Sequence, residues 1–207
     1  ILTSVCIIVL FSGIRASTVG IDNYEYSEWY KTLSIDNGIF ESITSNIMDY
    51  EPGFVVINYF LKYFSLDYNY ALIIYAVLIW IPIYQFIKFS KDFYFAIFVF
   101  ITLGFLFFTF NGQRQAIAIG FVFLGTRYLF EKRNFKFLLS IIVATMFHFS
   151  AILMLIILLI NKLPKLSTMT WLSFIIFSLI LPLSFLFGII EKVEIGRASC
   201  RERVSSP

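Results

Sequence analysis

One arginine stands where the start of a helix meets the expected edge of a membrane. Arg114 lies in the segment 111–115, Asn-Gly-Gln-Arg-Gln, between two apolar stretches that are long enough to cross a bilayer. A cation at a helix N-terminus is unfavourable, because the positive end of the helix dipole is there. The position makes sense if an anion binds at the same place, held by free backbone N–H groups and by the forked guanidinium. We predict that Arg114 binds an anionic group; the alternative is an arginine that only reaches lipid phosphates.

A single histidine lies deep in another apolar stretch. His148, in Phe-His-Phe-Ser, is the only histidine among the 207 residues. Ionisable groups inside a membrane are expensive, so such a residue is a functional candidate by default. Imidazole is also the side chain whose ordinary titration range suits a general base near neutral pH. The alternative is a neutral imidazole that hydrogen-bonds to a neighbouring helix.

Three further charged residues lie close to the ends of apolar stretches. Arg15 follows the first stretch, Asp22 begins a polar segment, and Glu51 precedes Pro52. Each has a plain alternative: Arg15 as an interfacial anchor, Asp22 as a helix cap, and Glu51 as a turn residue. We predict a catalytic group and an anion-binding group from these candidates. The catalytic candidates are His148, Asp22 and Glu51, and the binding candidates are Arg114, Arg15, Gln113 and Gln115.

Several other chemistries lack a signature in this sequence. We find no phosphate-binding glycine loop, no dinucleotide-binding glycines and no cluster of metal ligands, so we predict neither a cofactor nor a metal site. Outside the polar end 194–207, which is considered below, Cys6 is the only cysteine, so the sequence offers neither a disulfide framework nor a CxxC metal site. Without that end the formal net charge falls from +3 to 13 − 11 = +2, which is too small to indicate nucleic acid as a partner.

The elements that position these residues must be membrane helices. The chain is 59% hydrophobic and 14% charged, with a mean hydropathy of +0.86, whereas soluble domains carry about 25% charge. We predict an all-α, multi-pass transmembrane bundle of about five spans plus a re-entrant or interfacial half-helix at residues 54–64. The stretches expected to reach into the membrane are 1–12 (the end of a cut span), 69–89 with a kink at Pro82, 93–110, 113–130, 137–160 and 169–190.

The loops between these spans set the expected orientation. The basic loops 88–92 and 131–136 are predicted to be cytoplasmic by the positive-inside rule. The acidic segment 13–53, with a short interfacial helix that Asp22 caps, then lies outside the membrane beside the turn at 111–115. His148 lies about 18 Å from Lys136 along a helix, at about 1.5 Å per residue. All the candidate residues therefore converge on the outer side.

The two ends of the chain bear on its domain organisation. We expect residues 1–193 to form a single integral membrane domain that is truncated at both ends. Residues 194–204 read EIGRASCRERV, which resembles the translation of a common sequencing adapter. We therefore predict that residues 194–207 are a non-native tail and exclude them from fold reasoning.

Four motifs in order carry a resemblance to a known family. They are Arg15 with Val-Gly-Ile-Asp-Asn-Tyr at 19–24, Tyr-Glu-Pro-Gly-Phe at 50–54, Asn-Gly-Gln-Arg-Gln-Ala at 111–116, and His-Phe-Ser-Ala at 148–151. Together they resemble the EpsG family of Wzy-like polysaccharide polymerases over about residues 1–165. One departure is Ile21, where the family commonly has a small polar residue.

The resemblance implies a glycosyltransferase-type polymerase of the bacterial cytoplasmic membrane with its active site on the extracytoplasmic side. Its substrate would be oligosaccharide repeat units linked to undecaprenyl pyrophosphate, joined in exopolysaccharide, O-antigen or capsule biosynthesis. Its partners would be that lipid-linked substrate, membrane lipids and other polysaccharide synthesis and export proteins. In this chemistry an arginine stabilises the departing pyrophosphate and a base takes the hydroxyl proton. Two alternatives stay open: a transporter or flippase for the same lipid-linked sugars, and a structural subunit of a synthase complex.

Overall fold

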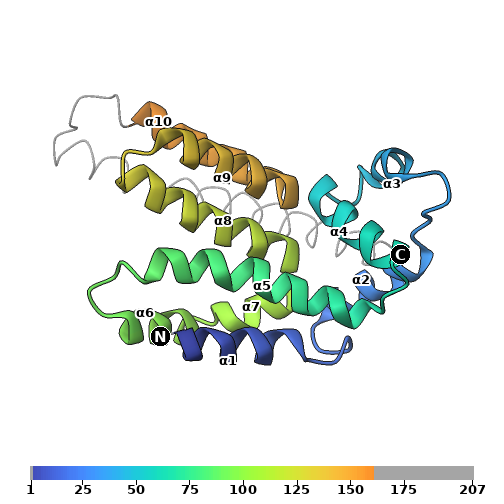
Figure 1. Ribbon diagram of the computed structural model, residues 1–207, viewed down its shortest axis with the longest axis horizontal. Coiled ribbons are helices and arrows are strands. Elements are labelled where there is room, and N and C mark those ends of the chain that lie inside the picture. Colours follow the sequence, from blue (N-terminus) through green and yellow to red (C-terminus); the bar gives the residue numbers. More distant parts are fainter. Residues whose placement is uncertain (1, 161–207) are drawn as a thin grey trace, which may run out of the picture. The chain divides into compact units, whose positions relative to one another are not determined.

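The computed structural model describes residues 2–160, and every regular element in that range is a helix (Figure 1). The all-α prediction is confirmed for this part of the chain. The predicted span 169–190 and the predicted tail 194–207 lie outside the described residues. In chain order the elements are α1 (Leu2–Gly13), α2 (Ile21–Thr32), α3 (Ile39–Asn46), α4 (Pro52–Tyr63), α5 (Tyr68–Ile87), α6 (Phe93–Thr102), α7 (Phe105–Asn111), α8 (Gln113–Phe130), α9 (Asn134–Phe147), the 3-10 helix η1 (Phe149–Leu155) and α10 (Ile156–Ile160).

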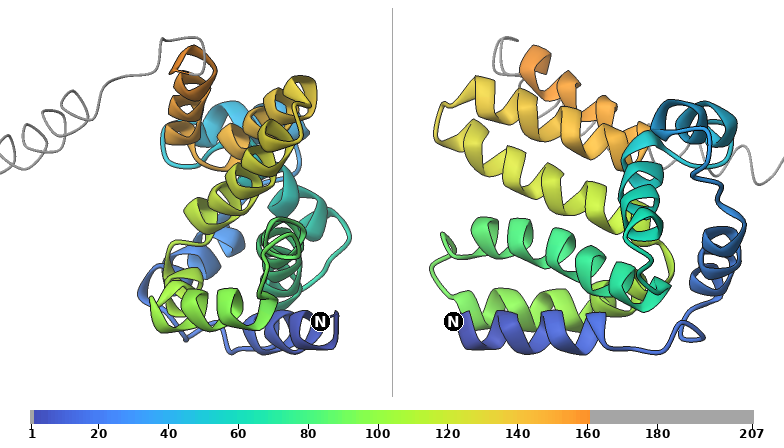
Figure 2. Two further views of the ribbon diagram at one scale, coloured as in Figure 1. Left: turned by 90° about the vertical axis from the view of Figure 1, so that its left-hand side faces the viewer. Right: turned by 45° about the vertical axis from the view of Figure 1, so that its right-hand side comes forward.

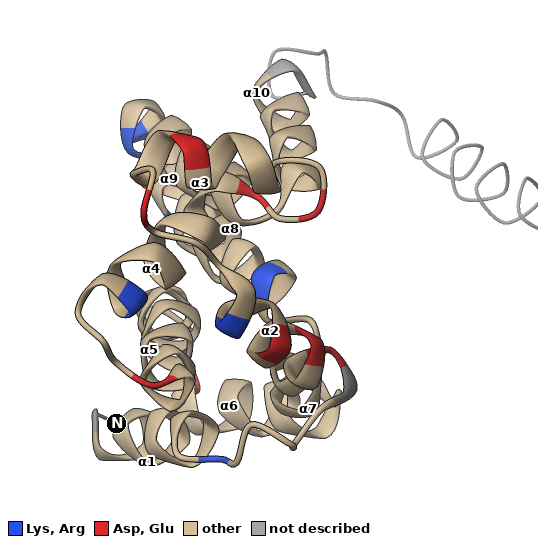
Figure 3. Ribbon diagram, turned by 90° about the vertical axis from the view of Figure 1, so that its right-hand side faces the viewer, with Lys and Arg blue, Asp and Glu red and all other residues tan. Residues whose placement is uncertain are grey.

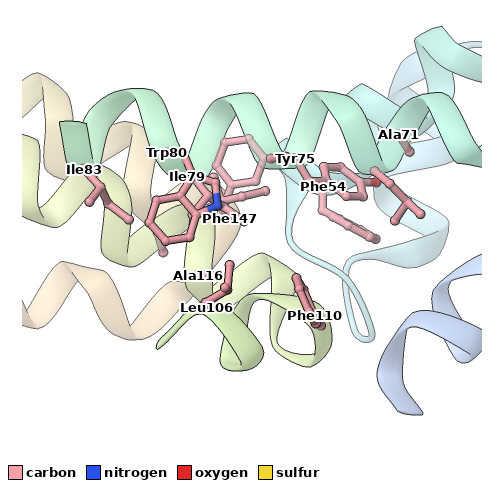
Figure 4. Packing of buried hydrophobic residues seen from close by; sticks show 14 of the residues in the cluster. Phe54, Ala71, Tyr75, Ile79, Trp80, Ile83, Leu106, Phe110, Ala116 and Phe147 are labelled. Carbon is pink, nitrogen blue, oxygen red and sulfur yellow. The ribbon is translucent and has the colours of Figure 1, made fainter. Parts of the chain in front are cut away.

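Helix α5 lies at the centre of the compact unit that ends at Ile157. Half of its residues are buried, and it packs against α1 on one side and α8 on the other, while α8 also packs against α9 (Figures 1 and 2). Trp80 is fully buried and donates from its indole N–H to the Ser12 hydroxyl, 3.2 Å away. Phe54 of α4 stacks on Tyr75 of α5 with ring centroids 5.3 Å apart (Figure 4). The first contact joins α5 to α1, and the second attaches the short helix α4 to the bundle.

The outer faces of the bundle are as apolar as its core. Large hydrophobic side chains are exposed on several helices, among them Phe11, Phe98, Phe107, Leu139 and Ile142. Exposed apolar surface on this scale indicates contact with lipid or with other helices rather than with water. Among residues 2–160, α5 is the one helix that is long and apolar enough to cross a membrane by itself, and α6 with α7 passes the same test only as a bent pair.

Two predicted continuous spans are wrong, because both are broken in the middle. The stretch 93–110 bends by 54° between α6 and α7. The break falls at Gly104, whose φ of 78° is left-handed and is accessible because glycine has no Cβ. The stretch 137–160 breaks at His148, whose φ and ψ of −158° and 115° are extended rather than helical. Hydropathy gives the length of an apolar run but does not detect a break in the helix within that run.

Other predicted elements fit the structure closely. Residues 113–130 match α8 at both ends, the half-helix at 54–64 is α4, and 69–89 is α5 with Pro82 inside it. Within the polar segment 13–53 the structure adds α3, which was not predicted. The prediction that Asp22 caps a helix is wrong, since α2 starts one residue earlier with Gly20 as its N-cap and Asp22 in its first turn. Gly20 has a φ of 100°, a conformation that glycine tolerates best.

Candidate functional site

The candidate residues gather at the end of the bundle where α2, α3 and the start of α4 lie. Figure 3 looks onto this end and shows acidic residues along α2, on α3 and next to α4. The segment 13–53, which was predicted as a loop outside the membrane, forms a polar layer at this end, in which α2 packs against α7 and α3 against α4. The candidate residues that meet at this end come from segments far apart in the sequence.

Glu51 is the centre of the site. Its Oε2 lies 2.5 Å from Nη1 of Arg114, and its Oε1 lies 3.0 Å from Nδ1 of His148. The partners are 63 and 97 residues away along the chain. Glu51 is only 5% exposed, so the carboxylate is withdrawn from solvent and charge-assisted hydrogen bonds to it are strong. The structure thus brings three of the predicted residues into one contact network.

The start of α4 explains how Glu51 reaches this position. Glu51 is the N-cap residue, but its side chain makes no capping bond and is left available for other partners. Pro52 follows at the first helical position, where its missing N–H costs nothing. A Cβ on Gly53 would lie 2.7 Å from the backbone oxygen of Met146, so only glycine permits this approach of α4 to α9. That approach places Glu51 beside His148, two residues beyond Met146.

Arg114 is held by an aromatic cage as well as by Glu51. Its guanidinium carbon lies 5.5, 5.0 and 5.9 Å from the ring centroids of Tyr26, Tyr50 and Phe54, within cation–π range. Its Nε donates to the Tyr26 hydroxyl at 3.3 Å, and Nη1 also donates to the Asp49 carbonyl at 3.0 Å. No described residue accepts from Nη2. One edge of the guanidinium is therefore left for another acceptor.

The buried tyrosine beside Arg114 stays neutral. Burial raises the pKa of the Tyr26 hydroxyl above its ordinary value, and the hydrogen bond from Arg114 offsets only part of this effect. Tyr26 therefore accepts a hydrogen bond without supplying a negative charge. The charge of Arg114 is paired in the structure with the Glu51 carboxylate, so binding of an external anion there stays a prediction.

His148 sits at the break between α9 and η1. Its backbone N–H still donates to the carbonyl of Ala144, while its own carbonyl accepts from Ala151. The side chain is 35% exposed, compared with 6% for the side chain of Glu51. Its Nδ1 faces Glu51, and within the described residues Nε2 makes no hydrogen bond. The ring therefore has one anchored nitrogen and one that remains for a substrate.

Arg15 lies apart from this network. It donates to the carbonyl of Ser12 and stacks on Phe110, whose ring centroid is 4.9 Å from the guanidinium carbon. Burial lowers the pKa of Arg15 to about 10, because the charged form loses hydration. Its Nε and Nη2 are buried without a partner among the described residues. Within the part of the chain that the structure describes, Arg15 is thus a cation without an ion-pair partner.

The two glutamines beside Arg114 have different surroundings. Gln113 is fully buried, and its Nε2 donates to Asn23 at 2.7 Å, an oxygen that also accepts from the Tyr68 hydroxyl. Gln115 is exposed and lines an apolar cavity of about 610 Å³ at the break between α6 and α7. The side chain of Gln113 therefore holds the fold together, whereas that of Gln115 is accessible.

The last predicted residue, Asp22, makes no ion pair among residues 2–160. The same part of the chain contains no group of three or more His, Cys, Asp or Glu arranged to hold a metal ion.

Sequence reasoning missed the cage residues Tyr26, Tyr50 and Phe54. Two of them lie in the motif at 50–54, so the signal was present, but a hydrophobic ring next to a proline turn reads equally well as packing.

Comparison with known proteins agrees with the motifs. The model of the EpsG family matches residues 1–200, which is nearly the whole chain. No curated protein and no solved structure matches it. The match includes all four motifs, among them the segments that supply Arg114, Glu51 and His148. The chain therefore belongs to the EpsG family and is a membrane protein of polysaccharide biosynthesis.

Proposed function

We propose that this protein is a polymerase that joins oligosaccharide repeat units carried on undecaprenyl pyrophosphate. The observation that carries the proposal is the meeting of Arg114, Glu51 and His148 at one end of an apolar bundle. A cation for a departing pyrophosphate and a base for an incoming hydroxyl are the two groups that this reaction needs. Membership of the family supports the substrate class.

The bonds that form and break assign a role to each group. A hydroxyl oxygen of the acceptor sugar attacks the anomeric carbon of the donor sugar, and the bond from that carbon to the lipid pyrophosphate breaks. Nε2 of His148 takes the hydroxyl proton. Arg114 offers Nη2 to a pyrophosphate oxygen while Nη1 stays on Glu51, so the leaving charge meets a donor that is already oriented.

The geometry favours His148 over the two carboxylates as the base. Both oxygens of Glu51 already accept hydrogen bonds, one from a guanidinium, so a proton on Glu51 would break a charge-assisted contact. Asp22, in the first turn of α2, has no side-chain partner among residues 2–160 that would orient it toward a substrate. Arg15 remains the second cation, because its charge is not compensated by a carboxylate of the described residues.

The membrane setting of the proposal follows from the apolar outer faces. The bundle spans the bacterial cytoplasmic membrane several times, with the polar layer 13–53 on the extracytoplasmic side. Lipid-linked sugars delivered to that side would meet the site without crossing the bilayer again. Other polysaccharide synthesis and export proteins are the expected neighbours.

An assay on the purified full-length protein with lipid-linked repeat units tests the proposal. With no other enzyme present, the polymerase should produce longer glycans on the lipid carrier, and Arg114→Ala and His148→Ala should not. The matched control is Arg133→Ala, which removes an exposed arginine at the other end of α8. Unchanged glycans that move between the leaflets of a vesicle would identify a flippase instead.

A further inference from the structure

A single carboxylate connects the cation and the base of the site. Glu51 gives one oxygen to Arg114 and the other to Nδ1 of His148. Arginine can only donate hydrogen bonds and an ionised carboxylate can only accept them. The hydrogen of the 3.0 Å contact must therefore come from Nδ1, which leaves Nε2 of the neutral ring without a proton.

We propose that Glu51 is a positioning residue that fixes the tautomer of His148 and makes Nε2 the proton-accepting atom. The catalytic consequence rests on the proposed function, whereas the tautomer itself does not. The two neutral imidazole tautomers are close in energy in water, so the partner of one nitrogen decides the state of the other. Glu51 is the one hydrogen-bond partner of the ring that the described part of the chain provides.

The groups around Glu51 leave it no second arrangement. From α8, Arg114 holds Oε2; from α2, the Tyr26 hydroxyl accepts from Arg114 Nε; and before α4, the Asp49 carbonyl accepts from the same nitrogen that contacts Glu51. All three contacts fix the guanidinium, which in turn fixes the plane of the carboxylate. Arg114 therefore orients His148 indirectly, through Glu51.

Replacing Glu51 by glutamine should reverse the tautomer. The amide oxygen must face Arg114, because a guanidinium cannot accept a hydrogen bond from the amide NH2. The NH2 group then faces His148, so Nδ1 has to accept and the ring proton moves to Nε2. Glu51→Gln keeps the shape of the side chain and changes only its charge. It should nevertheless place a proton on Nε2, so that this nitrogen can no longer accept one from the substrate. A comparable carboxylate-to-amide change beside a catalytic histidine lowers kcat by about 10⁴.

A second variant separates this effect from simple damage to the site. In Glu51→Gln with Arg114→Met, nothing prevents the amide from turning its oxygen toward the ring. Nδ1 can then donate to the amide oxygen again, so both tautomers should be populated, although the activity should stay low because the cation is missing. A purely structural role for Glu51 predicts no such dependence of the tautomer on Arg114.

The test is ¹⁵N NMR of the full-length protein, labelled at histidine, in lipid nanodiscs. His148 is the only histidine of these 207 residues, and its pair of ring signals is identified in the full-length protein as the pair that His148→Gln removes. Spectra are recorded at about pH 8, where an ordinary imidazole is neutral. The wild type should show a protonated Nδ1 and a bare Nε2. Glu51→Gln should show the reverse, and the double variant a mixture of the two patterns.

Each outcome bears on one statement. A wild-type ring that is protonated at Nε2 overturns the positioning role, whether or not any variant folds. An unchanged tautomer in Glu51→Gln does the same. The expected tautomers in a protein that lengthens no glycan would leave the positioning role standing and remove the proposed function. Glycan synthesis by a wild-type protein whose His148 is protonated at Nε2 would remove the positioning role and leave the proposed function standing.

Discussion

Replacing Gly53 by alanine tests whether the contact between α4 and α9 sets the geometry of the site. The added Cβ would lie 2.7 Å from the Met146 carbonyl oxygen, and ordinary van der Waals contact begins at 3.4 Å. The two backbones must therefore separate by about 0.7 Å. If that movement falls on the Glu51–His148 contact, its 3.0 Å distance grows to about 3.7 Å, which is outside hydrogen-bonding range.

The backbone itself does not oppose this substitution. Gly53 is the second residue of α4, and alanine is favoured over glycine in helices by about 1 kcal/mol. Any loss therefore comes from the clash, for which overpacking typically costs about 1–3 kcal/mol. We expect a modest fall in thermal stability together with a large fall in polymer length, because the base loses its orienting partner.

The assay compares polymer length at matched membrane abundance, beside thermal unfolding of the purified protein. Gly120→Ala is the matched control, because its Cβ would lie 2.9 Å from the carbonyl oxygen of Ile79, between α8 and α5. That variant should lose similar stability while its polymer length stays closer to wild type. Full-length polymer from Gly53→Ala would refute the argument that this close approach positions Glu51.

Three further predictions concern the two arginines and the topology. Arg114→Lys keeps the charge but not the forked geometry, so polymer synthesis should fall below that of the wild type. Arg114→Ala should lower the rate further, by roughly 10²–10³. Full-length polymer from Arg114→Ala would refute the role of Arg114 in binding the pyrophosphate. Burial lowers the pKa of Arg15 to about 10, so the guanidinium stays protonated at neutral pH and its burial lowers the stability of the fold there. This cost is relieved only as the pH rises past about 10. Arg15→Met should thus leave the unfolding temperature unchanged or raised while polymer length drops. A clear loss of stability would mean that the contacts of Arg15 with Ser12 and Phe110 outweigh the cost of burying its charge. Single cysteines at Asn37 and Asn134, in a background without native cysteines, should react with an impermeant maleimide in intact cells at 37 only, and labelling at 134 alone would invert the orientation.

The sequence by itself determined the class of structure and supplied the candidate groups of the site. Long apolar runs in a weakly charged chain must satisfy their backbone groups internally, which leaves helices as the solution. The glycine before Gln113 marked the start of α8 to the residue. Arg114 and His148 stood out because charge is expensive in such surroundings. Four ordered motifs were enough to predict the family that the comparison shows.

Only the tertiary structure decided how these groups are connected. Glu51 read equally well as a turn residue or as a base, and its place between Arg114 and His148 depends on contacts across 63 and 97 residues. Those contacts exist because Gly53 lets α4 approach α9, and because the chain breaks at His148 instead of continuing as a helix. Local spacing and hydropathy carry no information on either event, since both arise from the packing of separate helices. For the same reason the sequence did not predict that Glu51 pairs with Arg114 at the start of α8.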